Sequence, residues 1–296
     1  MQQAFSRTLL AMDLSPMDQR LLKYVAANAG ALGIEKAYFV HIMENFAMPK
    51  NVDVQFQKLF APEYPIDEKV RDKMSYDIGE VFGRHPELDC TVEVLEGKPY
   101  EKLIHWTKVK EIDLLVVGKK KRSEGSGITA RRVARNTACN VLFLPDRASL
   151  QTDNIVVPMD FSSHSRRALQ VALAIQERLP GLKVHGLYIV DLPPADYYSR
   201  THPGLGYRAV LMESAQLAYH SFMEDNGFPE SLIEMNFLEN KRYNITSYIE
   251  SFAKEKTASL VVMGARGHSP LETFLFGSIT EKLVERVSQT PVLVIR

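Results

Sequence analysis

The chain has 296 residues, and its 36 lysines and arginines balance 36 aspartates and glutamates, so the formal net charge is zero. Hydrophobic residues make up 45% and charged residues 24%, the balance of a soluble globular protein, and the neutral charge argues against a general nucleic-acid binder or a protein of anionic membrane surfaces. The two cysteines, Cys90 and Cys139, lack the spacing of a disulfide scaffold or a metal site, and no signal-peptide or bilayer-spanning pattern is present, so we expect a cytoplasmic protein.

The first half alternates short apolar runs, rich in β-branched residues, with longer stretches of helical periodicity. Leu9–Met12 predicts a strand, and Ser15 predicts the N-cap of the helix that follows. A long loop is predicted at 44–65 and an amphipathic helix at 100–106. Further strands are predicted, in chain order, at 37–42, 91–95, 112–118 and 141–144.

The same order of elements returns in the second half. Thr8–Ser15 returns as Ile155–Ser162 with an offset of 147 residues. The strand predicted at 112–118 returns at 258–264 with an offset of 146 residues. One period of about 150 residues, present twice, indicates a duplicated domain rather than a solenoid.

Each copy is predicted to be an α/β domain, one spanning residues 1–147 and the other 151–296, with a polar seam near Asp146–Asp153. Ser162 is expected to cap a helix as Ser15 does, and the segment 191–208, rich in proline and glycine, is predicted to be a loop. Strands that are apolar on both faces are typical of a parallel sheet covered by helices, so we expect five parallel strands in each copy, with ligands at their carboxyl ends. The second copy's later strands are predicted at 235–238, 260–263 and 292–295.

A glycine-rich loop follows the strand 260–263 in the second copy, with the spacing G-x2-G-x9-G-S. Gly264 at the strand end lets backbone approach a ribose or phosphate, and Gly267 can adopt the positive φ of an anion-binding turn. Gly277 and Ser278 open a helix whose free N–H groups favour negative charge. Additional donors or positive charge are expected from Arg266, His268 and Thr280.

The loop is neither a Walker P-loop, because it lacks Gly-Lys-Ser/Thr, nor the G-x-G-x-x-G dinucleotide fingerprint. Glycines at strand ends and helix starts are also common without a ligand. The combined spacing and hydroxyl favour nucleotide or phosphate binding.

The sequence resembles the universal stress protein family over nearly the whole chain. The opening Val156–Leu169 is similar to the family's start, and the spacing of Gly264, Gly267 and Gly277-Ser278 is similar to the loop of its ATP-binding branch. The resemblance implies two tandem Rossmann-like domains of the adenine-nucleotide alpha-hydrolase type, and ATP, ADP or AMP bound in the second, with or without Mg²⁺. The nucleotide-contacting residues that it implies, together with the loop pattern, are Pro158, Met159, Asp160, Ile189, Met263, Gly264, Arg266, Gly267, His268, Gly277, Ser278 and Ile279.

Two of these assignments have a structural alternative. Asp160 would lie by the adenosine, but the same residue could cap the turn before its helix. Ile189 would present backbone to the adenine, but it is a buried strand residue on either interpretation.

The first copy has a degenerate version of the loop. It is five residues shorter, with Lys121 in the place of Gly267, although Asp13 and Gly118 remain. The basic run Lys119–Arg122 is either a solvated loop or a different anion site, an alternative that Arg131, Arg132 and Arg135 keep open.

The sequence contains no evident nucleophile–base set, and its eight histidines are scattered. The leading hypothesis is therefore an ATP-binding regulatory protein of the stress response, and the others are a slow ATP hydrolase or nucleotidyl transferase, with Asp160 holding Mg²⁺, or an interaction module with empty pockets. The resemblance also suggests that the last strands of the two copies pair as a pseudo-dimer, and that two chains form a homodimer.

Overall fold

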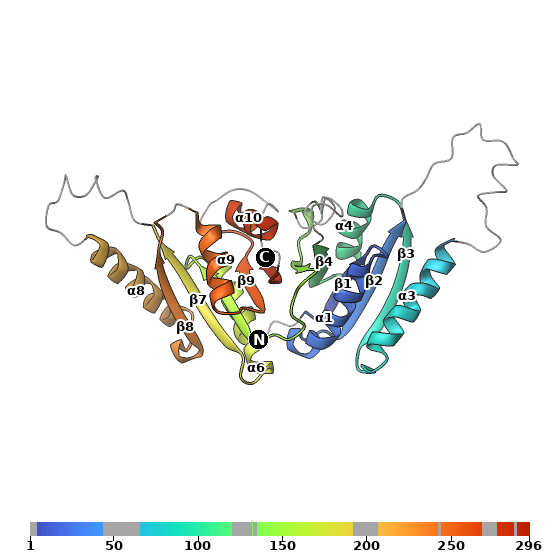
Figure 1. Ribbon diagram of the computed structural model, residues 1–296, viewed down its shortest axis with the longest axis horizontal. Helices are drawn as coiled ribbons and strands as arrows, with labels where there is room; N and C mark the ends of the chain where they lie inside the picture. The colour runs from blue at the N-terminus through green and yellow to red at the C-terminus, as the bar shows by residue number, and fades with distance from the viewer. Residues whose placement is uncertain are drawn as a thin grey trace, which may run out of the picture. The chain divides into compact units, whose positions relative to one another are not determined.

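The computed structural model describes residues 5–43, 66–119, 132, 135–191, 207–241, 244–267, 277–286 and 289–296. The chain divides into two compact units, one ending at Asp146 and the other starting at Arg147. Each unit is a parallel sheet flanked by helices (Figure 1). No helix among the described residues has both the length and the apolar character needed to span a bilayer.

In the first unit the strand order is β3-β2-β1-β4-β5, and the strand pairs are parallel. Its described elements are β1 (Arg7–Met12), α1 (Pro16–Leu32), β2 (Lys36–Met43), α3 (Ile66–Phe82), β3 (Asp89–Glu96), α4 (Pro99–Val109), β4 (Leu114–Lys119) and β5 (Asn140–Pro145).

The second unit repeats this order as β8-β7-β6-β9-β10, again with parallel pairs. The predicted five-stranded Rossmann-like architecture is therefore confirmed in both halves. The described elements are β6 (Asn154–Met159), α6 (Ser163–Arg178), β7 (Lys183–Val190), α8 (Tyr207–Asp225), η2 (Glu230–Leu232), β8 (Ile233–Glu239), α9 (Ile245–Glu255), β9 (Leu260–Gly264), α10 (Ser278–Arg286) and β10 (Val292–Ile295).

The structure tests only one of the two predicted loops. The loop predicted at 44–65 lies outside the described residues. The loop predicted at 191–208 overlaps α8, because Tyr207 and Arg208 are already helical. The sequence places the end of the loop from its last proline and glycine, but α8 begins at Tyr207, directly after Gly206.

Both predicted serine caps are confirmed. Ser15 Oγ accepts the N–H of Met17 at 3.2 Å, and Pro16 opens α1 with its fixed φ. Ser162 Oγ accepts the N–H of Ser165 at 3.3 Å at the start of α6. These caps set the direction in which each helix leaves the carboxyl end of its strand, which is where a ligand binds in such sheets.

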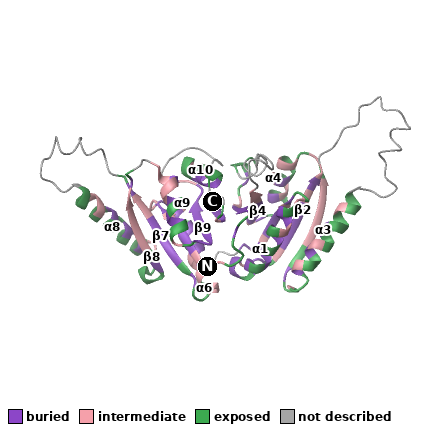
Figure 2. Ribbon diagram, in the orientation of Figure 1, coloured by how far each residue is buried: buried purple, intermediate pink, exposed green. Residues whose placement is uncertain are grey.

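The central strands form the core of each unit, and the outer strands β3 and β8 are half-exposed (Figure 2). Leu9 and Leu10 on β1, and Val156 and Val157 on β6, are fully buried. Residues buried on both faces explain why these strands are continuous apolar runs in the sequence.

Strained backbone conformations occur at corresponding positions in the two units. Leu14 and Phe161, 147 residues apart, have φ of 61° and 60°, and Glu111 and Thr257, 146 residues apart, have φ of 49° and 47°. Non-glycine residues rarely adopt this left-handed region. The same two turns are therefore required in each half, one after the first strand and one after the helix that precedes the fourth.

Replacing Glu111 by glycine is expected to stabilise the first unit by about 1 kcal/mol, since a Cβ in the left-handed region costs about that much. Glu111 follows the C-cap of α4, and its N–H donates to the carbonyl of Lys108 at 3.2 Å. Urea unfolding followed by the fluorescence of Trp106, the single tryptophan, measures the change. Glu111→Ala keeps the Cβ and should show no gain; a gain as large as glycine's would contradict the strain argument.

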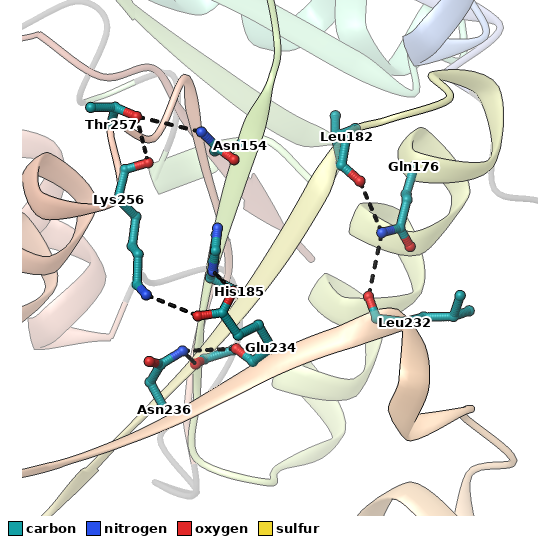
Figure 3. Close-up of polar contacts among 10 residues, drawn as sticks. Asn154, Gln176, Leu182, His185, Leu232, Glu234, Asn236, Lys256 and Thr257 are labelled. Carbon is teal, nitrogen blue, oxygen red and sulfur yellow. Dashed lines mark hydrogen bonds and ion pairs between the residues drawn. The ribbon is translucent and has the colours of Figure 1, made fainter.

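A buried histidine lies between charged groups in the second unit (Figure 3). His185 on β7 is 4% exposed, and its Nδ1 lies 3.2 Å from Glu234 Oε2 on β8. The other Glu234 oxygen accepts from Lys256 Nζ at 2.9 Å. Burial lowers the pKa of His185, the Glu234 carboxylate opposes that effect, and Lys256 and Lys183 reinforce it.

Lowering the pH from about 7 to about 5 is expected to destabilise the second unit. The folded-state pKa of His185 is depressed, so its stabilising contribution is complete above the unfolded value of about 6.5 and is lost as the pH falls through the folded value. Urea unfolding of the chain at several pH values measures this. The first unit has a tyrosine, Tyr38, at the position that corresponds to His185. The variant His185→Tyr should therefore fold and should weaken the pH dependence of the free energy of unfolding. An unchanged dependence on pH would show that His185 is not its source.

Candidate nucleotide site

A cavity of about 370 Å³ opens at the carboxyl ends of β6, β7 and β9 in the second unit. Eleven of the twelve predicted site residues line it; they are Pro158, Met159, Asp160, Ile189, Met263, Gly264, Arg266, Gly267, Gly277, Ser278 and Ile279. The twelfth, His268, lies outside the described residues. Residues separated by more than 100 positions in the sequence thus share one cavity wall.

Asp160 holds the turn before its helix, and it also lies at the cavity, where contact with an adenosine remains a prediction. Its Oδ1 accepts the N–H of Ser162 at 3.0 Å, which holds the turn in which Phe161 is left-handed. The residue also lines the cavity. The turn therefore fixes the carboxylate at the cavity wall.

Position 267 requires glycine for a different reason from the one we expected. It does not have a positive φ, so the predicted left-handed turn at this position is wrong. A Cβ on Gly267 would instead overlap Asp160 Oδ2. Glycine here lets the loop after β9 lie directly against the aspartate.

Gly264 also has a packing role. A Cβ there would lie 2.7 Å from the Cβ of His164 and 2.9 Å from its backbone carbonyl carbon. The first turn of α6 therefore packs directly on the end of β9. This contact requires glycine whether or not a ligand binds.

The loop returns to α10 through Gly277, whose N–H donates to the carbonyl of Ala265 at 2.8 Å. Among the described residues a Cβ on Gly277 would meet no atom closer than 3.6 Å, so their packing does not require glycine here. Thr280 is 3% exposed, and its hydroxyl donates to the carbonyl of Gly264 at 3.1 Å. Thr280 lines the cavity, but in this structure its hydroxyl donates within the protein and joins α10 to β9, so its role as a donor to a ligand stays a prediction.

Aromatic and acidic groups form part of the wall that the sequence did not indicate. Tyr188 stacks on Phe161 with ring centroids 4.6 Å apart and planes 4° apart. Burial raises the pKa of Tyr188, and the carboxylates of Asp160 and Asp191 raise it further. Asp191 also lines the cavity and accepts a hydrogen bond from the Asn240 side chain.

Other lining residues missed from the sequence are Ser165, Leu187, Ile245 and Ile249. Ile245 and Ile249 are four residues apart on α9, which places them on one helix face. That spacing is a usable signal for a helix face, but it does not show that the face borders a cavity.

Arg266 brings a positive charge to the cavity wall. Burial lowers the pKa of His164, Arg167 and Arg266 lower it further, and Asp160 opposes them. The neutral form of His164 is therefore favoured. Among the described residues no group of three or more His, Cys, Asp or Glu side chains could hold a metal ion.

In the first copy, Lys119 ends β4, whereas residues 120–131 lie outside the described part of the chain. The predictions for Lys121, for its neighbours Lys120 and Arg122 and for Arg131 fall there and remain predictions. Arg132 and Arg135 are exposed.

Comparison with known proteins agrees with this fold. The family model described as the universal stress protein family matches residues 4–145 and again residues 151–296. The chain belongs to this family. "Universal stress protein MJ0531" of Methanocaldococcus jannaschii is 30% identical over 142 residues, covering 48% of this chain and 81% of that protein.

Two solved structures cover nearly all of the chain. A universal stress protein from Archaeoglobus fulgidus is 17% identical with a TM-score of 0.65, and the match covers 99% of this chain and 97% of that one. The functionally unknown protein PA1789 from Pseudomonas aeruginosa is 13% identical with a TM-score of 0.64, covering 98% and 92%. At these identities the similarity supports the tandem fold.

Proposed function

We propose that this universal stress protein binds an adenine nucleotide, ATP or its products ADP and AMP, in its second unit and acts as a nucleotide-binding regulator of the stress response. The observation that carries the proposal is the single cavity shared by eleven of the twelve residues predicted for such a site. Its mixture of apolar wall, few polar groups and open strand ends suits a small-molecule site.

The cavity offers distinct surroundings for the two ends of a nucleotide. Asp160, Ile189 and Met263 line it at the strand ends, where the adenosine would lie. Arg266, Gly277 and Ser278 line it at the loop and at the start of α10, where helix N–H groups and the helix dipole favour phosphate. The carboxylate of Asp160 is an oxygen donor of the kind Mg²⁺ prefers, so this residue would hold an ion only in the alternative in which the chain hydrolyses ATP.

Saturating ATP is expected to stabilise the chain by about 2.7 kcal/mol at a concentration 100 times its Kd. Thermal unfolding with ATP, ADP, AMP and GTP, with and without Mg²⁺, measures the effect and ranks the nucleotides. Calorimetric titration gives the stoichiometry, expected to be one ATP per chain. Absence of any shift with millimolar ATP, ADP and AMP would rule out the proposal and favour an interaction module without nucleotide.

The enzymatic alternative has a separate measurement. Phosphate release from ATP faster than about one per minute, a rate still below typical enzyme turnover, and lost in Asp160→Ala, would identify a hydrolase. We expect slower turnover.

We also propose that two chains associate into a homodimer, as the family resemblance suggests. Light scattering coupled to size-exclusion chromatography compares the mass in solution with the 33.5 kDa of one chain. A monomeric mass across the concentration range would contradict this.

A further inference from the structure

Basic side chains surround one aromatic ring at the amino ends of the strands in the first unit. Tyr38 on β2 is 4% exposed. Its ring centroid lies 5.4 Å from Lys36 Nζ, 5.8 Å from Lys110 Nζ and 5.9 Å from Arg7 Cζ. Arg7 and Lys36 are the first residues of β1 and β2. This group, the Tyr38 cluster, therefore lies at the opposite end of the sheet from the carboxyl edge, where ligands bind in such folds.

The second unit balances the corresponding lysine with a carboxylate. Lys256 corresponds to Lys110, and its Nζ donates to Glu234 Oε1 at 2.9 Å (Figure 3). Glu234 lies across from the residue that corresponds to Tyr38, and Thr91 takes this place in the first unit. The first unit therefore has a hydroxyl where the second unit has a carboxylate.

The ammonium of Lys110 contacts aromatic rings instead of an acid. Its Nζ lies 5.0 Å from the ring centroid of Trp106, in addition to its contact with Tyr38. Among the described residues no acidic side chain pairs with it. A ring attracts a cation without neutralising it, so Lys110 keeps its positive charge for an anion.

Arg7 brings a second cation to the cluster, at a position where the second unit has the neutral Asn154. Its Nη2 donates to the hydroxyl of Tyr38 at 3.0 Å, whereas its buried Nε has no hydrogen-bond partner among the described residues. Asp113 accepts from the backbone N–H of Arg7 at 2.9 Å. In the described part of the chain the guanidinium itself therefore has no carboxylate partner.

Lys36, the third cation, is partly neutralised. Its Nζ pairs with Asp89 Oδ2 at 2.5 Å, and this carboxylate raises the pKa of the lysine. The guanidinium of Arg7 acts in the opposite direction and lowers that pKa, because like charges disfavour each other's charged forms. The two cations therefore repel each other, and an anion bound beside them would relieve this repulsion.

We propose that the Tyr38 cluster binds a phosphate group, either as inorganic phosphate or pyrophosphate or as the phosphate of an organic monoester. Cations gathered around one ring suit a compact, multiply charged oxyanion. The guanidinium of Arg7 keeps donors that Tyr38 does not use, and the ammonium of Lys110 adds a point charge. The zero net charge of the chain disfavours a nucleic acid or an anionic membrane as the source of the phosphate. The proposal does not depend on the nucleotide cavity of the second unit.

The test titrates the full-length chain with pyrophosphate, phosphate and glycerol 3-phosphate at constant ionic strength and at about pH 8, where a phosphate monoester is a dianion. Trp106 is the single tryptophan, and its ring contacts the Lys110 ammonium, so its fluorescence should change saturably when the anion binds. Chloride at the same ionic strength should cause no such change. Glycerol 3-phosphate distinguishes the sources within the proposal: binding as tight as that of phosphate indicates an organic monoester, and weaker binding indicates a free inorganic anion.

Two variants locate the site. Thr91→Glu places a carboxylate where the second unit has Glu234, so it should pair with Lys110 and weaken pyrophosphate binding at least about tenfold, through the added like charge. Thr91→Gln is its neutral control and should bind as the native chain does. Arg7→Asn, which takes the residue type of the second unit, should also weaken binding about tenfold. Lys23→Gln removes an exposed lysine on α1 and controls for the loss of one positive charge.

Calorimetric titration of the same variants measures the affinity without relying on the tryptophan. Affinity unchanged in both Thr91→Glu and Arg7→Asn, or no saturable change of Trp106 fluorescence with any of the three phosphates, would overturn the proposal. The cations would then serve only to cover the ring of Tyr38. The ATP stabilisation proposed for the second unit is measured separately, so either proposal can fail while the other stands.

Discussion

Replacement of Gly277 by valine is expected to abolish the stabilisation of the chain by ATP. The valine methyls would occupy space on the cavity wall between the loop and the start of α10, where the phosphates are proposed to lie. A Cβ at this position would meet Ala265 and Arg266 only at 3.6 Å, an ordinary contact. The unliganded variant should therefore lose no more than about 1 kcal/mol, the scale of a poorer N-cap, while the shift of about 2.7 kcal/mol at 100 times Kd disappears. Thermal unfolding with and without ATP measures both quantities.

The matched control is Gly79→Val. Gly79 lies on α3 in the first unit, and a Cβ there would meet no atom of the described residues within 4 Å. This variant should keep the full ATP shift. If Gly277→Val kept it as well, the phosphates would not lie at this loop, and the placement of the nucleotide would have to be revised.

Much of the fold could be predicted because the repeat is visible in the strands. The match between Thr8–Ser15 and Ile155–Ser162 fixes an alignment between the halves, and hydrophobic runs buried on both faces then identify a parallel sheet. The left-handed residues Leu14 and Phe161 are separated by the same offset as the repeat. Neither leucine nor phenylalanine favours this conformation, so the residue types do not predict the turns. Backbone strain at a leucine or phenylalanine is imposed by the surrounding structure, so it cannot be inferred from local preference.

The site could be predicted where a residue lies at a strand end or in the glycine loop. Tyr188 and Asp191 were missed, because their part in the wall depends on how the end of β7 packs against Phe161 and Asn240. The hydrogen-bond partner of Thr280 could not be predicted for a related reason. A hydroxyl in the first turn of a helix has the same sequence pattern whether it meets a ligand or, as here, the carbonyl of Gly264.

Gly264→Ala is expected to destabilise its unit by about 1–3 kcal/mol more than Gly118→Ala destabilises the other, the usual scale of overpacking. The two glycines are counterparts, but their neighbours differ. A Cβ at 264 would meet the Cβ and backbone carbonyl of His164 at 2.7–3.0 Å, so α6 itself must move. A Cβ at 118 would meet the Cγ of Met17, and a flexible side chain can turn aside at lower cost. Urea unfolding, with Trp106 reporting on the first unit and circular dichroism on both, measures the two costs.

Double variants distinguish a clash with a side chain from a clash with the backbone. Met17→Ala should relieve Gly118→Ala, whereas His164→Ala should not relieve Gly264→Ala, because the clash with the Cβ and carbonyl group remains. Equal costs in the two units would contradict this account. The contrast also ranks the glycines as indicators of a ligand. Gly264 is required by helix packing in any case, while no contact in the described structure requires glycine at 277, so the proposed nucleotide offers a reason for it that packing does not.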